Sequence, residues 1–207
     1  MMGQSYYTQN FKVRFENKCV RLLVDAYNQS VTEKTIQLNW EETDITSQLR
    51  EYIEKNPLKT IWEISCNVDP HLHNNRGKKE KGFAKKERKV DLSFVKFQQR
   101  LFQSNKEHVV FAEAKNLKEN DSKLKRRYID TGMGNFISGI YPLGLLVGYF
   151  LEGNVHATIE GINHMLNKDN REKDCLHPKK HAIVRYYCES YHYDLCIKHL
   201  IFDFTTL

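Results

Sequence analysis

Apolar residues recur at helical spacing in the first quarter of the chain. Over 11–27 they fall three or four positions apart, which predicts an amphipathic helix. A similar pattern predicts a helix over 44–55, with Thr43 or Asp44 as its N-cap and Pro57 after its end. The segment 35–40 between them is expected to be extended. The two apolar faces consist of Phe11, Phe15, Cys19, Leu22, Leu23 and Ala26, and of Ile45, Leu49, Tyr52 and Ile53.

The middle of the chain changes to strand-like patterns. The run over 143–151 is almost entirely apolar, which is typical of a strand that is buried on both faces. Polar residues with several Lys and Arg separate the apolar segments. We expect strands over 60–68, 90–97, 108–115 and 143–151, loops over 69–89 and 116–127, and a helix over 128–140.

These elements predict an α/β fold, a mixed sheet with flanking helices. The order over 43–151 is helix, strand, strand, strand, helix, strand. A helix over 155–166 and strands over 182–193 and 195–204 extend this core. Since the chain contains no internal repeat and no Gly/Ser-rich linker, we expect one domain over 1–207, with a C-terminal extension over 152–207.

Composition places this domain among globular proteins with a basic balance. Of the 207 residues, 40% are hydrophobic and 28% charged, which argues against disorder, and 32 Lys and Arg against 26 Asp and Glu give a net charge of +6. The longest apolar run covers 142–151, half of the about 20 residues that a membrane span needs. No signal peptide is visible and five scattered cysteines suit reduced thiols, so we expect a cytoplasmic protein.

Three ionisable residues stand where apolar residues are expected. Asp91 begins one predicted strand, and Glu113 and Lys115 lie on one face of the next. Burying charged groups is unfavourable unless they are paired or hold a metal. If the strands are neighbours, Asp91 approaches Glu113, and a divalent cation between them would remove their repulsion. Lys115 could then orient a water or stabilise charge on a phosphate, a combination suited to phosphodiester hydrolysis.

Basic residues on both sides of these strands would contact the phosphates of a nucleic acid. The alternative for such charge runs is a solvated loop. The candidate residues are Lys78, Lys79, Lys85, Lys86, Arg88, Lys125, Arg126 and Arg127.

The spacing of Asp91 and Glu113-Ala114-Lys115, after a helix and a first strand, resembles the PD-(D/E)xK nuclease superfamily. That resemblance implies a restriction-endonuclease-like core over 43–151. It implies that Asp91 and Glu113 bind Mg²⁺ or Mn²⁺, that the Ala114 carbonyl is a further metal ligand, and that Lys115 is the catalytic lysine. Val90 stands where the superfamily often has proline.

The resemblance implies two further site residues. Many members add a glutamate from the first core helix; Glu42 is the candidate and Glu41 the alternative, although a glutamate at a helix start is also a favourable partner of the helix dipole. The segment after the E-x-K strand is similar to a helix from which a basic or amide residue points at the active site. Asn135 occupies that position.

The function expected from these residues is Mg²⁺-dependent nuclease activity, with DNA as the expected substrate. The resemblance suggests restriction, phage defence or a mobile element, with a homodimer or a larger defence complex as the assembly. Two alternatives remain, a non-catalytic nucleic-acid-binding module on the same fold and a protein-interaction subunit. Cys and His residues over 175–199 could bind zinc, but no tight zinc-finger spacing is present and packing in the core is the favoured interpretation.

Overall fold

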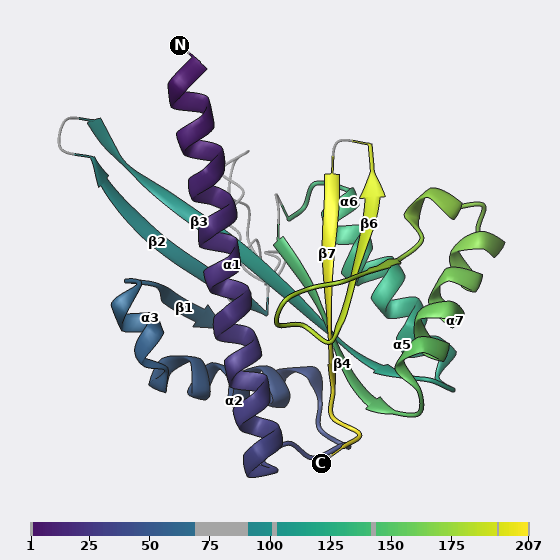
Figure 1. Ribbon diagram of the computed structural model, residues 1–207. Helices are drawn as coiled ribbons and strands as arrows, with labels where there is room; N and C mark the ends of the chain where they lie inside the picture. The colour runs from purple at the N-terminus through teal and green to yellow at the C-terminus, as the bar shows by residue number, and fades with distance from the viewer. Residues whose placement is uncertain (1, 69–90, 101–102, 142–143, 194, 207) are drawn as a thin grey trace, which may run out of the picture.

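The computed structural model describes residues 2–68, 91–100, 103–141, 144–193 and 195–206 (Figure 1). Within them, one seven-stranded sheet has the strand order β1-β2-β3-β4-β7-β6-β5. The strands are β1 (Ser65–Val68), β2 (Leu92–Arg100), β3 (Gln103–Lys118), β4 (Gly144–Glu152), β5 (His177–Lys179), β6 (Tyr186–His192) and β7 (Leu195–Asp203). The expected mixed sheet with flanking helices is confirmed.

The centre of the sheet is parallel and its two sides are antiparallel. β3, β4 and β7 run in the same direction, whereas β1, β2 and β3 alternate on one side and β7, β6 and β5 on the other. β4 begins at Gly144, where a Cβ atom would lie 2.1 Å from the Phe111 carbonyl oxygen. Glycine therefore permits the close approach of β4 to β3.

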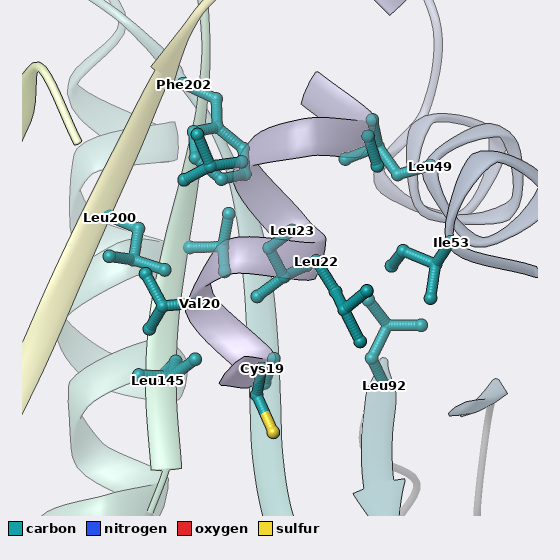
Figure 2. Packing of buried hydrophobic residues seen from close by; sticks show 14 of the residues in the cluster. Cys19, Val20, Leu22, Leu23, Leu49, Ile53, Leu92, Leu145, Leu200 and Phe202 are labelled. Carbon is teal, nitrogen blue, oxygen red and sulfur yellow. The ribbon is translucent and has the colours of Figure 1, made fainter. Parts of the chain in front are cut away.

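Two long helices cover one face of the sheet. α1 (Met2–Glu33) lies across the sheet, and α2 (Glu42–Lys55) packs beside it. Figure 2 shows Leu23 of α1 between the strands and α2, with Leu200 on the β7 side and Ile53 on the α2 side. All three side chains are fully buried. The aliphatic face that the sequence predicted for α2 forms its contact with this core.

The crossover from β3 to β4 covers part of the other face. It consists of α5 (Ser122–Arg127), a π-helical turn η1 (Tyr128–Met133) and α6 (Gly134–Ile137). α7 (Val155–Lys168) completes this layer, and a 3₁₀ turn η2 (Glu172–Asp174) follows. Since parallel strands need such a crossover, this segment fixes where the end of β3 lies relative to the helices.

Several boundaries predicted from the sequence are wrong. Residues 35–40, expected to be extended, contain a turn at 38–39 and belong to no strand of the sheet. The strand expected from 60 begins at 65, because Asn56 caps a short helix α3 (Pro57–Ile61) that has proline in its first turn. The loop expected over 116–127 contains the end of β3, which pairs with β4, and α5, whose first N–H groups are capped by Asp121. The loop expected over 69–89 lies outside the described residues.

Other predictions hold with shifted ends. The helix expected over 11–27 extends over Met2–Glu33, and α2 begins at Glu42 with Glu41, not Thr43 or Asp44, as its N-cap. The apolar strand is confirmed, because every residue from 144 to 151 is buried. In the described part of the chain, no helix is both long and apolar enough to cross a membrane.

Candidate active site

Asp91, Glu113 and Lys115 converge where β2 begins beside β3. The register pairs Leu92 with Ala112, which brings the residue before β2 next to the E-x-K segment. Asp91 Oδ2 accepts a hydrogen bond of 2.6 Å from the Ala114 N–H. The backbone of β3 therefore holds the aspartate, and the spacing seen in the sequence becomes a spatial cluster.

The Lys115 ammonium lies at the centre of this cluster. Its Nζ atom is 2.6 Å from both Glu113 Oε1 and the Ala114 carbonyl oxygen. It is also 3.7 Å from Glu42 Oε2 and 4.0 Å from Asp91 Oδ2. One nearly buried cation thus faces oxygen atoms from four residues, and their charges attract it strongly in a poorly solvated site.

Glu42 reaches this cluster from the first residue of α2. Its Oε1 atom accepts a hydrogen bond of 3.2 Å from the Asn116 N–H, and its Oε2 atom accepts one of 3.2 Å from Arg127 Nη2. Glu41 instead caps the helix. Of the two glutamates that the sequence left open, the structure brings Glu42 to the cluster.

Glu113 is buried in an unusual electrostatic setting. It is 5% exposed, and its Oε2 atom is buried without a hydrogen-bond partner among the described residues. Burial raises the pKa of its carboxyl to about 7; Lys115 and the nearby Tyr141 side chain counteract the rise, while Asp91 adds to it. A buried acceptor of this kind favours a proton or a cation.

The oxygen atoms around Lys115 fit a divalent cation. The described residues contain no ready-made group of three or more His, Cys, Asp or Glu side chains that could hold a metal. The available ligands are the carboxylates of Asp91 and Glu113 and the Ala114 carbonyl, and two of these three already contact the Lys115 ammonium. Mg²⁺ typically takes one or two carboxylates and keeps several waters, so this donor set and the unpaired Glu113 Oε2 suit it.

The basic residues expected to contact nucleic acid differ in their surroundings. Arg127 is 54% exposed on its side chain and adjoins Glu42. Lys125 donates to the Glu119 carbonyl at 2.8 Å, and Arg126 forms an ion pair with Asp169. Among these three, Arg127 is the one at the cluster. Lys78, Lys79, Lys85, Lys86 and Arg88 lie outside the described residues.

Asn135 lies on α6, half-buried, and its carbonyl oxygen accepts from the Tyr141 N–H at 3.0 Å. Two residues near the cluster were not foreseen from the sequence. Asn116 donates from Nδ2 to the Trp40 carbonyl and thereby connects β3 to the start of α2. The Tyr141 side chain lowers the pKa of the Glu113 carboxyl. Because Asn116 directly follows the E-x-K segment, the sequence could have indicated that it lies near the cluster. Tyr141 lies 28 positions away from Glu113, and no sequence pattern indicated its position.

Among the described residues, the C-terminal Cys and His side chains form no metal group, and three of them, Cys188, His192 and His199, are buried. His199 Nδ1 lies 2.8 Å from the Tyr128 hydroxyl, and its Nε2 atom lies 2.8 Å from Ser190 Oγ. Ser190 Oγ is also 2.8 Å from His192 Nε2. These contacts support the interpretation of the two histidines as core residues.

A scan against protein-family models, a search of curated proteins and a search of solved structures each found no match to this chain. The geometry of the cluster is therefore the guide to the chemistry of this protein.

Proposed function

We propose that the protein is a metal-dependent nuclease with a restriction-endonuclease-like core. The observation that carries this proposal is the convergence of Asp91, Glu113 and Lys115 at the β2–β3 junction, with Glu42 reaching them from α2. The strand order β1-β2-β3-β4, with a helical crossover before the parallel β4, supports the assignment of the core.

In this mechanism, Asp91, Glu113 and the Ala114 carbonyl would hold Mg²⁺ or Mn²⁺. The ion would supply Lewis-acid chemistry to the phosphodiester when bound. Lys115 would leave the Ala114 carbonyl and donate from Nζ to a phosphate oxygen that gains negative charge. Arg127, which is half-exposed beside Glu42, donates to the phosphate and positions the scissile group.

The proposed substrate is DNA, and the basic balance of the chain favours a polyanion. A role in restriction, phage defence or a mobile element, in the cytoplasm and as a homodimer or part of a larger complex, belongs to the same proposal.

Cleavage of plasmid and single-stranded circular DNA in Mg²⁺, Mn²⁺ or EDTA tests this function. We expect metal-dependent cleavage that falls at least about 100-fold in Glu113→Gln and in Lys115→Gln. Glu152→Gln is the matched control, because this exposed carboxylate pairs with Lys118 at the ends of the neighbouring strands. Cleavage that survives in both site variants contradicts the proposed site.

A second candidate is a non-catalytic nucleic-acid-binding module. The observation that favours it is the Lys115 ammonium itself, which already neutralises Glu113 and occupies the Ala114 carbonyl. Calorimetric titration with Mn²⁺ separates the two functions. The nuclease proposal expects binding that is lost in Asp91→Asn, whereas the module expects DNA binding without metal binding or cleavage.

A further inference from the structure

A cavity of about 550 Å³ is lined by residues of the β6–β7 hairpin, α6 and the η2 region, and no residue of the carboxylate cluster lines it. This volume falls within the range of small-ligand sites. The residues relevant here are Ile137 of α6, Arg171, Lys173 and Asp174 of the η2 region, and His192 and Tyr193 of the hairpin. Glu172 also lines the cavity, so its charge offsets that of Lys173 and recognition there depends on shape and hydrogen bonds.

Tyr193 is an unusual residue for its position in the β6–β7 hairpin. It is fully exposed, so its ring contributes nothing to the core. Its φ angle is +49°, a region that glycine and asparagine adopt readily and a bulky aromatic residue rarely does. An exposed ring in a strained backbone conformation at the edge of a cavity indicates a role in binding, since neither packing nor turn formation favours tyrosine there.

Asp174 presents fixed acceptor atoms in the same cavity. Its Oδ2 atom accepts from Arg171 Nε at 2.7 Å, and its Oδ1 atom lies 2.7 Å from His192 Nδ1. Because a carboxylate only accepts, His192 donates from Nδ1 and its Nε2 atom accepts from the Ser190 hydroxyl. Each Asp174 oxygen keeps a further lone pair for a ligand, and its partners hold the carboxylate in place.

α6 connects this cavity to the carboxylate cluster. Tyr141, which influences Glu113, packs edge-on against Phe136 with ring centroids 5.4 Å apart. The next residue, Ile137, lines the cavity. Along the sheet, Glu113 lies on β3, and the hairpin includes β6, three strand positions away. Three spacings are roughly 14 Å across the sheet, and Glu113 lies level with His199, six residues beyond Tyr193 in the sequence. The two sites are therefore about 24 Å apart, which several nucleotides of an extended strand can cover.

We propose that this cavity binds an unpaired nucleobase of a single-stranded segment of the substrate, next to the segment at the carboxylate cluster. The base stacks on Tyr193, its exocyclic amino group donates to Asp174, and Lys173 contacts the adjoining phosphate. Cytosine satisfies this arrangement, whereas thymine has no exocyclic amino group. The inference rests on the proposed function for its substrate class but is independent of cleavage.

Fluorescence anisotropy in EDTA with labelled oligo(dC), oligo(dT) and duplex DNA tests the proposal. For Tyr193→Ala, we expect the Kd of oligo(dC) to rise at least about fivefold, while Tyr193→Phe, which keeps the ring, stays within about twofold of the unchanged protein. The loss should persist at high salt, because stacking is not an ionic contact. Oligo(dC) should bind more tightly than oligo(dT), and Asp174→Asn should reduce this preference.

Ile61→Ala is the control, since Ile61 is 70% exposed on α3 and does not line the cavity. The proposal is overturned if the unchanged protein does not bind oligo(dC), if Tyr193→Ala binds it with unchanged Kd, or if the variant loses duplex binding equally. Metal-dependent cleavage together with oligo(dC) binding that does not depend on Tyr193 would remove this inference and leave the nuclease proposal intact. Binding that depends on Tyr193 without cleavage would do the reverse.

Discussion

Lys115 and Glu113 illustrate what a sequence shows about individual residues. Alternation along a strand placed both on one face, and the contact of 2.6 Å between their side chains agrees with this. The sequence could not show that the backbone N–H of Ala114 holds Asp91, or that Arg127 adjoins Glu42. Such contacts depend on strand register and on the end of a crossover helix, neither of which residue types encode.

The buried pair predicts a stability effect that is separate from activity. Lys115→Met should lower the free energy of unfolding by about 3 kcal/mol, because the Glu113 carboxylate loses its cation. The double variant Glu113→Gln/Lys115→Met should recover most of this loss, since it removes both buried charges. Urea unfolding of the single and double variants measures the coupling.

The control is a double-mutant cycle on the more exposed pair Lys118–Glu152, whose charged atoms lie 3.3 Å apart at the ends of β3 and β4. Its coupling should stay below about 1 kcal/mol. Equal coupling in the two cycles would contradict the importance of burial.

Among the elements, the apolar period predicts the packing of α2 correctly but not the geometry of η1. The apolar face of α2 could be predicted from the sequence because the apolar residues that recur with the 3.6-residue helical period are the ones that contact the core. η1 is a π-helical turn, and the same period misplaces its side chains, so the helix expected over 128–140 has a different internal geometry and ends at Ile137. Tyr128, the first residue of η1, is fully buried and contacts His199 of β7.

The burial of His199 predicts that the protein becomes less stable in acid. Burial lowers the pKa of His199 from its usual 6.5 to about 3. Below pH 6.5, His199 therefore binds a proton in the unfolded chain but stays neutral in the folded protein. The free energy of unfolding should fall by about 2 kcal/mol between pH 6.5 and 5 through this residue, and the fall continues toward pH 3.

Urea unfolding of the unchanged protein and of His199→Gln at both pH values checks the prediction, with a smaller pH dependence expected in the variant. His164→Gln, which replaces an exposed histidine of α7, controls for the loss of a histidine as such. The same pH dependence in all three proteins would refute the role of burial.

For the whole molecule, net charge was a weaker guide than its distribution. Arg126 pairs with Asp169 and Lys125 with the Glu119 carbonyl, so part of the positive charge is already engaged within the fold. Composition alone could not distinguish these residues from ones available to a ligand. The class of fold followed from the order of elements, whereas the central place of β7 in the sheet did not.

Salt dependence of DNA binding tests which basic residues contact phosphates. Each phosphate contact that is lost should reduce the slope of log K against log salt by about 0.9 for duplex DNA. Replacing Lys78, Lys79, Lys85, Lys86 and Arg88 together with glutamine should reduce the slope by several such steps. Lys125→Gln should leave the slope nearly unchanged. The opposite ranking would contradict the assignment of the phosphate contacts to residues 78–88. Anisotropy titrations between 50 and 200 mM salt provide the slopes.

The position of β7 also has a consequence for synthesis of the chain. β4 pairs with β3 on one side and with β7 on the other, yet residues 195–203 leave the ribosome long after residues 144–152. During that interval β4 is an apolar strand with an open edge, the kind of segment on which nascent chains aggregate. Yield in a cell should therefore depend on translation speed and chaperone supply more than the stability of the finished sheet would suggest.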